Sequence, residues 1–297
     1  MTRQPVNLSC VLPTAQREGY AVGSFSARYT DMIRPILRAG EKLRSPLIVQ
    51  IAKVELDRYQ ITVEEIADTF MRAINELCIT VPTVLHLDHT QDFTVIQQAI
   101  QAGFSSVMID ASAQPLEDNI SITREVVEYA HRHNVSVEAE LGRLGSADGL
   151  ESGQDDELYT DPEEAAYFAR QTGVDALAVS VGTIHGVYQV RQPKIDINQL
   201  QAIRASTPVP LVLHGGSGNP AEMIRSAIQI PGGGVSKINI ATDLELALLA
   251  ALGREKRMLN QEFQTLPEDS RVQALKAVED TVADKMQHFL YSAHQVH

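Results

Sequence analysis

The stretch HLDH (residues 86–89) ends a short apolar run, and two later apolar runs end in the same way, in VSVGTIHG (179–186) and LVLHGG (211–216). If these runs are parallel strands of one barrel, His89, His185 and His214 meet at one rim, because strand ends share a face. Neutral imidazole suits zinc and its first-row neighbours, and three protein ligands leave positions open for a substrate. The pattern therefore predicts a catalytic metal site.

Short runs rich in Val, Ile and Leu recur along the whole chain, separated by segments with helical spacing. There are eight: AVGSFS (21–26), PLIVQIA (46–52), VPTVLHLD (81–88), SSVMIDA (105–111), VSVEAEL (135–141), DALAVSV (175–181), VPLVLHGG (209–216) and VSKINIA (235–241). Strands buried on both faces appear as continuous apolar runs, and intervening helices indicate a parallel sheet. We therefore expect an α/β fold, a (β/α)8 TIM barrel with extra C-terminal helices, forming a single domain over residues 1–297.

The composition is that of a soluble globular protein, with 44% hydrophobic and 21% charged residues and a formal net charge of -13. This charge repels nucleic acid and anionic membrane surfaces, so neither is an expected partner. Cys10 and Cys78 are too few for a disulfide framework, and no apolar stretch is long enough for a signal peptide or membrane helix. We expect a cytoplasmic protein.

Three segments outside the strands carry further expectations. The sequence TDPEE (160–164) predicts a helix start, with an N-cap, a proline in the first turn and acidic residues near the positive end of the dipole. The polar segment GSADGLESGQDDELY (145–159) is either a mobile active-site loop or a disordered insertion. Residues 243–297 are expected to form two helices, and the apolar segment 246–252 is a candidate interface for a homodimer or homotetramer.

Carboxylates accompany the histidines on the predicted strands. Asp88 stands directly before His89, at a strand end where a carboxylate is expected to serve chemistry or a buried ion pair. Glu138 and Glu140 share one face of their strand by period-two alternation, and we expect both to point into the barrel. Buried carboxylates there favour a nearby cation, so Glu140 is a candidate alternate metal ligand.

Two glycine-containing turns follow predicted strands beside the histidines. In His185-Gly186 and His214-Gly215-Gly216-Ser217-Gly218, the main-chain amides can approach a ligand closely, and a following helix start favours an anion. After the last strand, Asn239-Ile240-Ala241-Thr242 could complete such a site. Phosphate groups often bind the loops after strands seven and eight of this architecture, so a phosphorylated small substrate is expected.

Several motifs together resemble the class II, zinc-dependent ketose-bisphosphate aldolases, in particular the tagatose-bisphosphate and fructose-bisphosphate branch. They are HLDH (86–89), MIDAS (108–112), VEAELGRLG (137–145), YTDPEEA (159–165), GTIHGVY (182–188), LVLHGGSG (211–218) and KINIATDL (237–244). They span nearly the whole chain in the family's order. The resemblance implies a metal-dependent lyase that reversibly cleaves a phosphorylated ketose into dihydroxyacetone phosphate and an aldehyde.

The resemblance also implies roles for individual residues. One catalytic Zn2+ ion per subunit would be bound by His89, His185 and His214, with Glu140 as the alternate ligand, and Asp88 would exchange the proton of the C4 hydroxyl. The substrate contacts would be Gly186, Gly215, Gly216, Ser217, Asn239, Ile240, Ala241 and Thr242, with Asn239 near the enediolate. A monovalent cation, Na+ or K+, could border Gly186 and Ser217.

Four departures from the family's pattern concern the substrate. Asp148 or Glu151 stands where a loop glutamate that exchanges the C3 proton is usual, and Asp148 is one methylene shorter. The usual phenylalanine-asparagine pair is Phe25-Ser26, a hydroxyl residue after the second strand is replaced by Ala52-Lys53, and D-G-S becomes Asp110-Ala111-Ser112. We therefore expect a changed aldehyde partner. The alternatives are a sugar-phosphate-binding or accessory subunit with impaired catalysis, and another metal-dependent lyase or epimerase.

Overall fold

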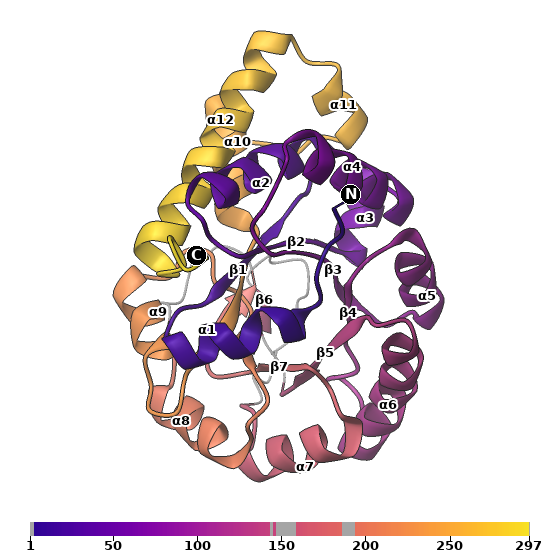
Figure 1. Ribbon diagram of the computed structural model, residues 1–297, viewed down its shortest axis with the longest axis vertical. Coiled ribbons are helices and arrows are strands. Elements are labelled where there is room, and N and C mark those ends of the chain that lie inside the picture. Colours follow the sequence, from indigo (N-terminus) through magenta and orange to yellow (C-terminus); the bar gives the residue numbers. More distant parts are fainter. Residues whose placement is uncertain (1–2, 143–144, 147–158, 186–193, 297) are drawn as a thin grey trace.

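The computed structural model describes residues 3–142, 145–146, 159–185 and 194–296 (Figure 1). Eight parallel strands form a closed barrel in the order β1-β10-β9-β7-β5-β4-β3-β2. Their bounds are β1 Val22–Ser26, β2 Leu47–Ala52, β3 Thr83–Thr90, β4 Ser106–Ile109, β5 Ser136–Leu141, β7 Ala176–Val179, β9 Leu211–Leu213 and β10 Val235–Ile240. Each of the eight predicted runs overlaps one of these strands, and β3 continues two residues beyond its run, so the predicted (β/α)8 TIM barrel is confirmed.

The helices surround the barrel (Figure 1) and bury their apolar sides against the strands. They are α2 Ile33–Lys42, α3 Lys53–Tyr59, α4 Val63–Glu76, α5 Phe93–Ala102, α6 Leu116–Arg132, α7 Pro162–Thr172, α8 Ile197–Ser206 and α9 Ala221–Ile228, while α1 Leu12–Glu18 lies at one end of the barrel. The predicted helix start at TDPEE is confirmed, because the Asp161 carboxylate accepts hydrogen bonds from the Glu163 and Glu164 amides at 2.8 and 3.0 Å. Within the described part of the chain, each helix is too short or too polar to cross a bilayer.

One end of the barrel is closed by the N-terminal segment. Leu8 and Leu12, from the short turn before α1 and from α1 itself, pack into a buried cluster with Val22, Ile48 and Val84 near the starts of their strands. Figure 1 shows α1 lying across this end. The N-terminal segment therefore closes the end at which the strands begin. Polar side chains can face a ligand at the opposite end, where the strands have their carboxyl ends.

The C-terminal tail differs from the two helices that we expected. It forms α10 Thr242–Ala251, α11 Asn260–Gln264 and α12 Glu268–Asp284, followed by a π-helical turn at Lys285–Phe289. Gly253 adopts a left-handed conformation (φ 63°) just after α10, so α10 ends before it, and Pro267 stands at the N-cap where α12 begins. Helix α12 packs against α10 and α2.

A second, two-stranded sheet lies outside the barrel and was not expected from the sequence. It pairs β6 Gly145–Ser146 with β8 Ile184–His185, in the register Ser146 with His185. The segments that follow β5 and β7 are therefore adjacent at the backbone level, and the pairing brings the backbone of His185 beside the start of the predicted loop 145–159.

Candidate active site

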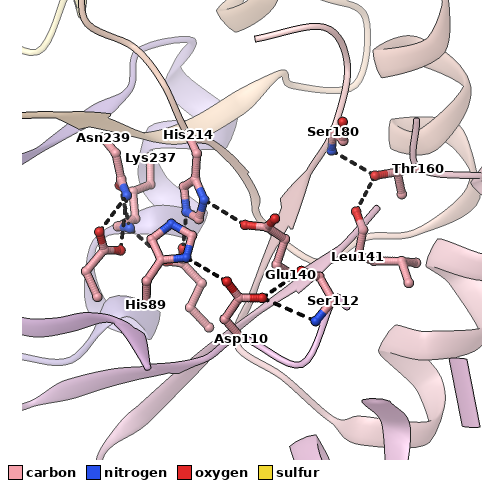
Figure 2. Close-up of polar contacts among 12 residues, drawn as sticks. His89, Asp110, Ser112, Glu140, Leu141, Thr160, Ser180, His214, Lys237 and Asn239 are labelled. Carbon is pink, nitrogen blue, oxygen red and sulfur yellow. Dashed lines mark hydrogen bonds and ion pairs between the residues drawn. The ribbon is translucent and has the colours of Figure 1, made fainter. Parts of the chain in front are cut away.

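Polar side chains from four strands meet at the carboxyl end of the barrel (Figure 2). Asp88 and His89 belong to β3, Glu138 and Glu140 to β5, and Asn239 to β10, while His214 follows β9 directly. All except His89 are buried. The period-two prediction for Glu138 and Glu140 is confirmed, because both carboxylates contact the same imidazole inside the barrel.

His214 lies between these two glutamates. Its Nδ1 is 2.9 Å from Glu140 Oε2, and its Nε2 is 2.9 Å from Glu138 Oε1. Burial alone would disfavour the imidazolium, but the hydrogen bonds to both glutamates raise the pKa of His214 above its ordinary value. Burial raises the pKa of Glu140 as well. The imidazole is thus fixed in orientation by two carboxylates.

His89 is held in the same way by a different carboxylate. Its Nδ1 is 2.9 Å from Asp110 Oδ2, and Asp110 Oδ1 in turn accepts hydrogen bonds from the amide and hydroxyl of Ser112 at 3.2 and 2.7 Å. Although burial opposes it, the charge of Asp88 and the hydrogen bond to Asp110 raise the pKa of His89 to about 10. The His89 and His214 rings are 4.5 Å apart between centroids. Two of the three predicted histidines are therefore brought together.

These groups have the chemistry of a metal site. Potential ligand atoms of Asp88, His89 and His214 lie within 4.8 Å of one another, and so do those of His89, Asp110 and Glu140. Zinc binds imidazole nitrogens and carboxylate oxygens. In many zinc sites a carboxylate also accepts a hydrogen bond from the second nitrogen of a histidine ligand and so fixes its orientation. The residues present fit a divalent metal ion.

Asp88 lies beside this cluster and is surrounded by hydrogen-bond donors. Gln50 Nε2 donates to Asp88 Oδ2 at 3.0 Å, and Asn239 Nδ2 donates to both carboxylate oxygens, at 3.1 and 3.2 Å. Burial alone would raise the pKa of Asp88, but the charge of His89 and the His86 imidazole, 3.7 Å away, hold that pKa well below its usual range. The ionised carboxylate is the form that can accept a proton.

The predicted glycine turn after β9 packs against the end of β10. An added Cβ at Gly215 (φ 65°) would lie 2.2 Å from the carbonyl oxygen of Ile184, and one at Gly216 would lie 2.7 Å from that of Asn239. Only glycine allows this approach. The Ser217 hydroxyl accepts hydrogen bonds from the amides of Ala241 and Asp243, each at 3.2 Å. The two predicted substrate segments, 215–217 and 239–242, are therefore neighbours.

Some predicted site residues lie outside the described part of the chain. Asp148, Glu151 and Gly186 are among them, and so is most of the predicted loop 145–159. For His185 the structure describes the backbone, in β8, and not the side chain.

Two polar contacts of the site were missed by sequence reasoning. Gln50 was not identified as a partner of Asp88, although a glutamine inside the apolar run LIVQIA was a usable signal. Asp110 was identified only as part of a motif, and its hydrogen bond to His89 was not foreseen.

Comparisons with known proteins agree with this geometry. Residues 6–295 match the sequence profile of the family described as fructose-bisphosphate aldolase class-II. The chain is 40% identical over 287 residues to the 6-phospho-5-dehydro-2-deoxy-D-gluconate aldolase of Bacillus subtilis (strain 168), covering 96% of this chain and 95% of that protein. It is 36% identical over 291 residues to the fructose-bisphosphate aldolase of Staphylococcus aureus (strain Mu50 / ATCC 700699), covering 96% of each.

A solved structure shows the same architecture. The crystal structure of the YdjI aldolase from Escherichia coli K12 superposes with a TM-score of 0.83 at 29% identity, covering 99% of this chain and 100% of that one. One conclusion follows from the profile match over nearly the full length, the two relatives above one third identity and the shared fold. This chain belongs to the class II fructose-bisphosphate aldolase family and is an aldolase, a carbon–carbon lyase.

Proposed function

We propose that this aldolase reversibly cleaves a phosphorylated ketose, with a ketose 1,6-bisphosphate as the first candidate, into dihydroxyacetone phosphate and an aldehyde. The observation that carries the proposal is the meeting of His89 and His214 next to Asp88, with potential ligand atoms within 4.8 Å. A Lewis acid and a proton acceptor side by side are what cleavage of a C3–C4 bond beside a ketone requires.

In this proposal His89, His185 and His214 hold one catalytic zinc ion, with Glu140 as the alternate ligand. When bound, zinc supplies a Lewis acid that stabilises the negative charge developing at the ketone. Asp110 and Glu138 hold the imidazoles of His89 and His214 in orientation, through the 2.9 Å contacts described above. The fixed rings reduce the reorganisation that binding would otherwise require.

Asp88 acts as the general base in cleavage and as the general acid in condensation. Its carboxylate accepts the proton of the C4 hydroxyl as the C3–C4 bond breaks, and the electrons of that bond remain on C3. Gln50 and Asn239 donate to both of its oxygens, which fixes the plane of the carboxylate. Asp148, or Glu151 in its place, would return a proton to C3, and Asn239 would lie near the enediolate.

The phosphate of the dihydroxyacetone half would bind Gly186, Gly215, Gly216 and Ser217 together with residues 239–242. The proximity of the turn after β9 to the start of α10 supports this part of the proposal, because helix N-termini and glycine turns offer free amides to anions. A monovalent cation, Na+ or K+, would border Gly186 and Ser217. The enzyme would work in the cytoplasm as a single-domain subunit.

A second candidate substrate follows from the relative that is 40% identical over 287 residues. By its name, 6-phospho-5-dehydro-2-deoxygluconate carries a ketone beside a phosphorylated carbon, as a ketose bisphosphate does. The two substrates differ only in the half that leaves as the aldehyde, which ends in a carboxylate in one and in a phosphate in the other. Ser26, Ala52 and Ala111, where this chain departs from the family pattern, would line that half.

A substrate panel tests the proposal. We expect the zinc-loaded protein to release dihydroxyacetone phosphate from at least one ketose 1,6-bisphosphate or from 6-phospho-5-dehydro-2-deoxygluconate. Coupled enzymatic reduction of the released dihydroxyacetone phosphate measures the rate. A chelator should abolish release, and one equivalent of zinc should restore it. Stoichiometric zinc with no turnover on any member would instead support an accessory sugar-phosphate-binding role.

We also propose that the chain forms a homodimer or homotetramer through α10 and its neighbours. Val54, Leu246 and Leu259 are 55%, 48% and 39% exposed, unusually high for large apolar side chains. Each is within two residues of a member of one ion network, in which the buried Arg28 contacts Glu55 and Glu245, and Glu245 contacts the exposed Arg257. The three apolar side chains therefore belong to one region of the surface.

Replacing Leu246 with glutamate should lower the molar mass in solution from that of the oligomer toward that of one chain. A charge within a mainly apolar contact costs association free energy, because it is desolvated without a partner. Light scattering coupled to size exclusion measures the mass. Ile122→Glu is the matched control, since Ile122 is 38% exposed on α6, away from α10 (Figure 1). An unchanged oligomer in Leu246→Glu would place the interface elsewhere.

A further inference from the structure

Lys237 is a fully buried cation that the proposed mechanism does not use. It lies on β10 at 0% exposure, two residues before Asn239, so both side chains point to the same face of the strand. Its Nζ donates to Asn239 Oδ1 at 2.7 Å and lies 2.9 Å from Glu138 Oε2 (the contact with Asn239 is drawn in Figure 2). Placing an ammonium in the barrel interior is costly, so a function is expected of it.

We infer that Lys237 is a positioning residue, which fixes the Asn239 amide with its NH2 group toward Asp88. This inference rests on the proposed function of Asp88 as the acid–base group. Lys237 contacts Asn239 directly, and its charge also contributes to the lowered pKa of Asp88, so a test must separate the positioning role from this electrostatic effect.

The argument depends on which groups can donate. A lysine ammonium has three donors and no acceptor, so it selects the oxygen of the asparagine amide. The NH2 group must then point the other way, where it donates to Asp88 Oδ1 and Oδ2 at 3.1 and 3.2 Å. A rotated amide would place its oxygen against the carboxylate and its NH2 against the ammonium, which is unfavourable at both ends. Lys237 therefore decides the orientation of an otherwise ambiguous group.

Lys237 is itself held by Glu138. The same carboxylate contacts His214 Nε2 through its other oxygen, at 2.9 Å, so the ammonium and the imidazole share one fixed partner. Burial alone would raise the pKa of Glu138, but the Lys237 charge and the His214 hydrogen bond lower it to about 2. The chain of contacts runs from His214 through Glu138, Lys237 and Asn239 to Asp88, and it connects the proposed metal ligand with the proposed base.

A double-mutant cycle separates this role from charge compensation. Lys237→Met should lower kcat for the best substrate of the panel on the order of 10- to 100-fold, the scale expected when an outer partner of a site is lost. In the Asn239→Ala background, the same change should lower kcat by no more than about threefold, because the group through which Lys237 acts is gone. Equal losses in both backgrounds, or an unchanged kcat in Lys237→Met, would overturn the inference.

A nuclear magnetic resonance measurement gives a readout independent of turnover. The side-chain amide signals of Asn239, assigned by their loss in Asn239→Ala, should shift and broaden in Lys237→Met. Those of Asn119, whose amide donates to the Glu140 carbonyl at 3.0 Å, serve as the internal control and should stay unchanged. If wild type shows no aldolase turnover but the Asn239 signals respond as described, the proposed function fails and the positioning role stands.

A folding safeguard keeps the test decisive. If Lys237→Met does not fold because Glu138 is left without a counter-charge, Glu138→Gln and Glu138→Gln/Lys237→Met replace the pair in both Asn239 backgrounds. The double variant carries no charge at this pair, and in Glu138→Gln the Lys237 ammonium keeps hydrogen-bond acceptors in the amide oxygens of the introduced glutamine and of Asn239. The loss of kcat between them should again depend on the presence of Asn239, and a loss that does not depend on it would overturn the inference.

Discussion

Asp88→Asn should lower kcat for cleavage by about 10² to 10⁴-fold, the contribution expected of a positioned acid–base group. Asparagine has nearly the same shape but cannot accept the C4 hydroxyl proton. The proposed zinc ligands remain, so the variant should still bind one equivalent of zinc per chain. Steady-state cleavage kinetics together with metal analysis of the dialysed protein measure both quantities.

The matched control for Asp88→Asn is Asp92→Asn. Asp92 is four residues away and exposed, and its carboxylate caps α5 by accepting a hydrogen bond from the Thr94 amide at 2.8 Å. Asparagine is about as good an N-cap as aspartate, so this variant should keep both its rate and its stability. Loss of zinc together with activity in Asp88→Asn would show that Asp88 is a metal ligand rather than the base.

His214→Ala should remove zinc binding and cleavage together. Changing outer partners of a metal ligand costs about 10- to 100-fold in affinity, and deleting a ligand itself should cost more than that. The variant should also be less stable, because Glu138 and Glu140 both lose their shared hydrogen-bond donor inside the barrel. Zinc titration with a competing chromophoric chelator and thermal unfolding measure the two effects.

His131→Ala is the control for that experiment. His131 also contacts a carboxylate, Asp175 Oδ2 at 2.8 Å, but it lies partly exposed at the end of α6, by the strand starts at the opposite end of the barrel. Its zinc stoichiometry and kcat should equal those of wild type. Full zinc binding in His214→Ala would mean that the metal is held by other residues.

The barrel and part of the site could be predicted because their signals are local. Strands buried on both faces produce continuous apolar runs, and all eight runs form barrel strands. Period-two alternation was sufficient to place Glu138 and Glu140 on the inner face, where both reach His214. The glycines after His214 also indicated a close backbone approach, which the structure contains.

The remaining contacts depend on features that no local pattern encodes. The hydrogen bond between His89 and Asp110 forms where the register between β3 and β4 shifts and where His89 has a left-handed backbone (φ 26°). The contact of Gln50 with Asp88 depends on how β2 and β3 are aligned. The sheet of β6 and β8 pairs segments about 40 residues apart, a tertiary arrangement that periodicity cannot reveal.

The most direct measurement is anomalous X-ray scattering at the zinc edge from crystals of the protein loaded with one equivalent of zinc. The account predicts one strong peak at the carboxyl mouth of the barrel, with nitrogens of His89, His185 and His214 at about 2.0 to 2.1 Å. A peak bound by other residues, or a peak contacted by fewer than two of these histidines, would contradict it.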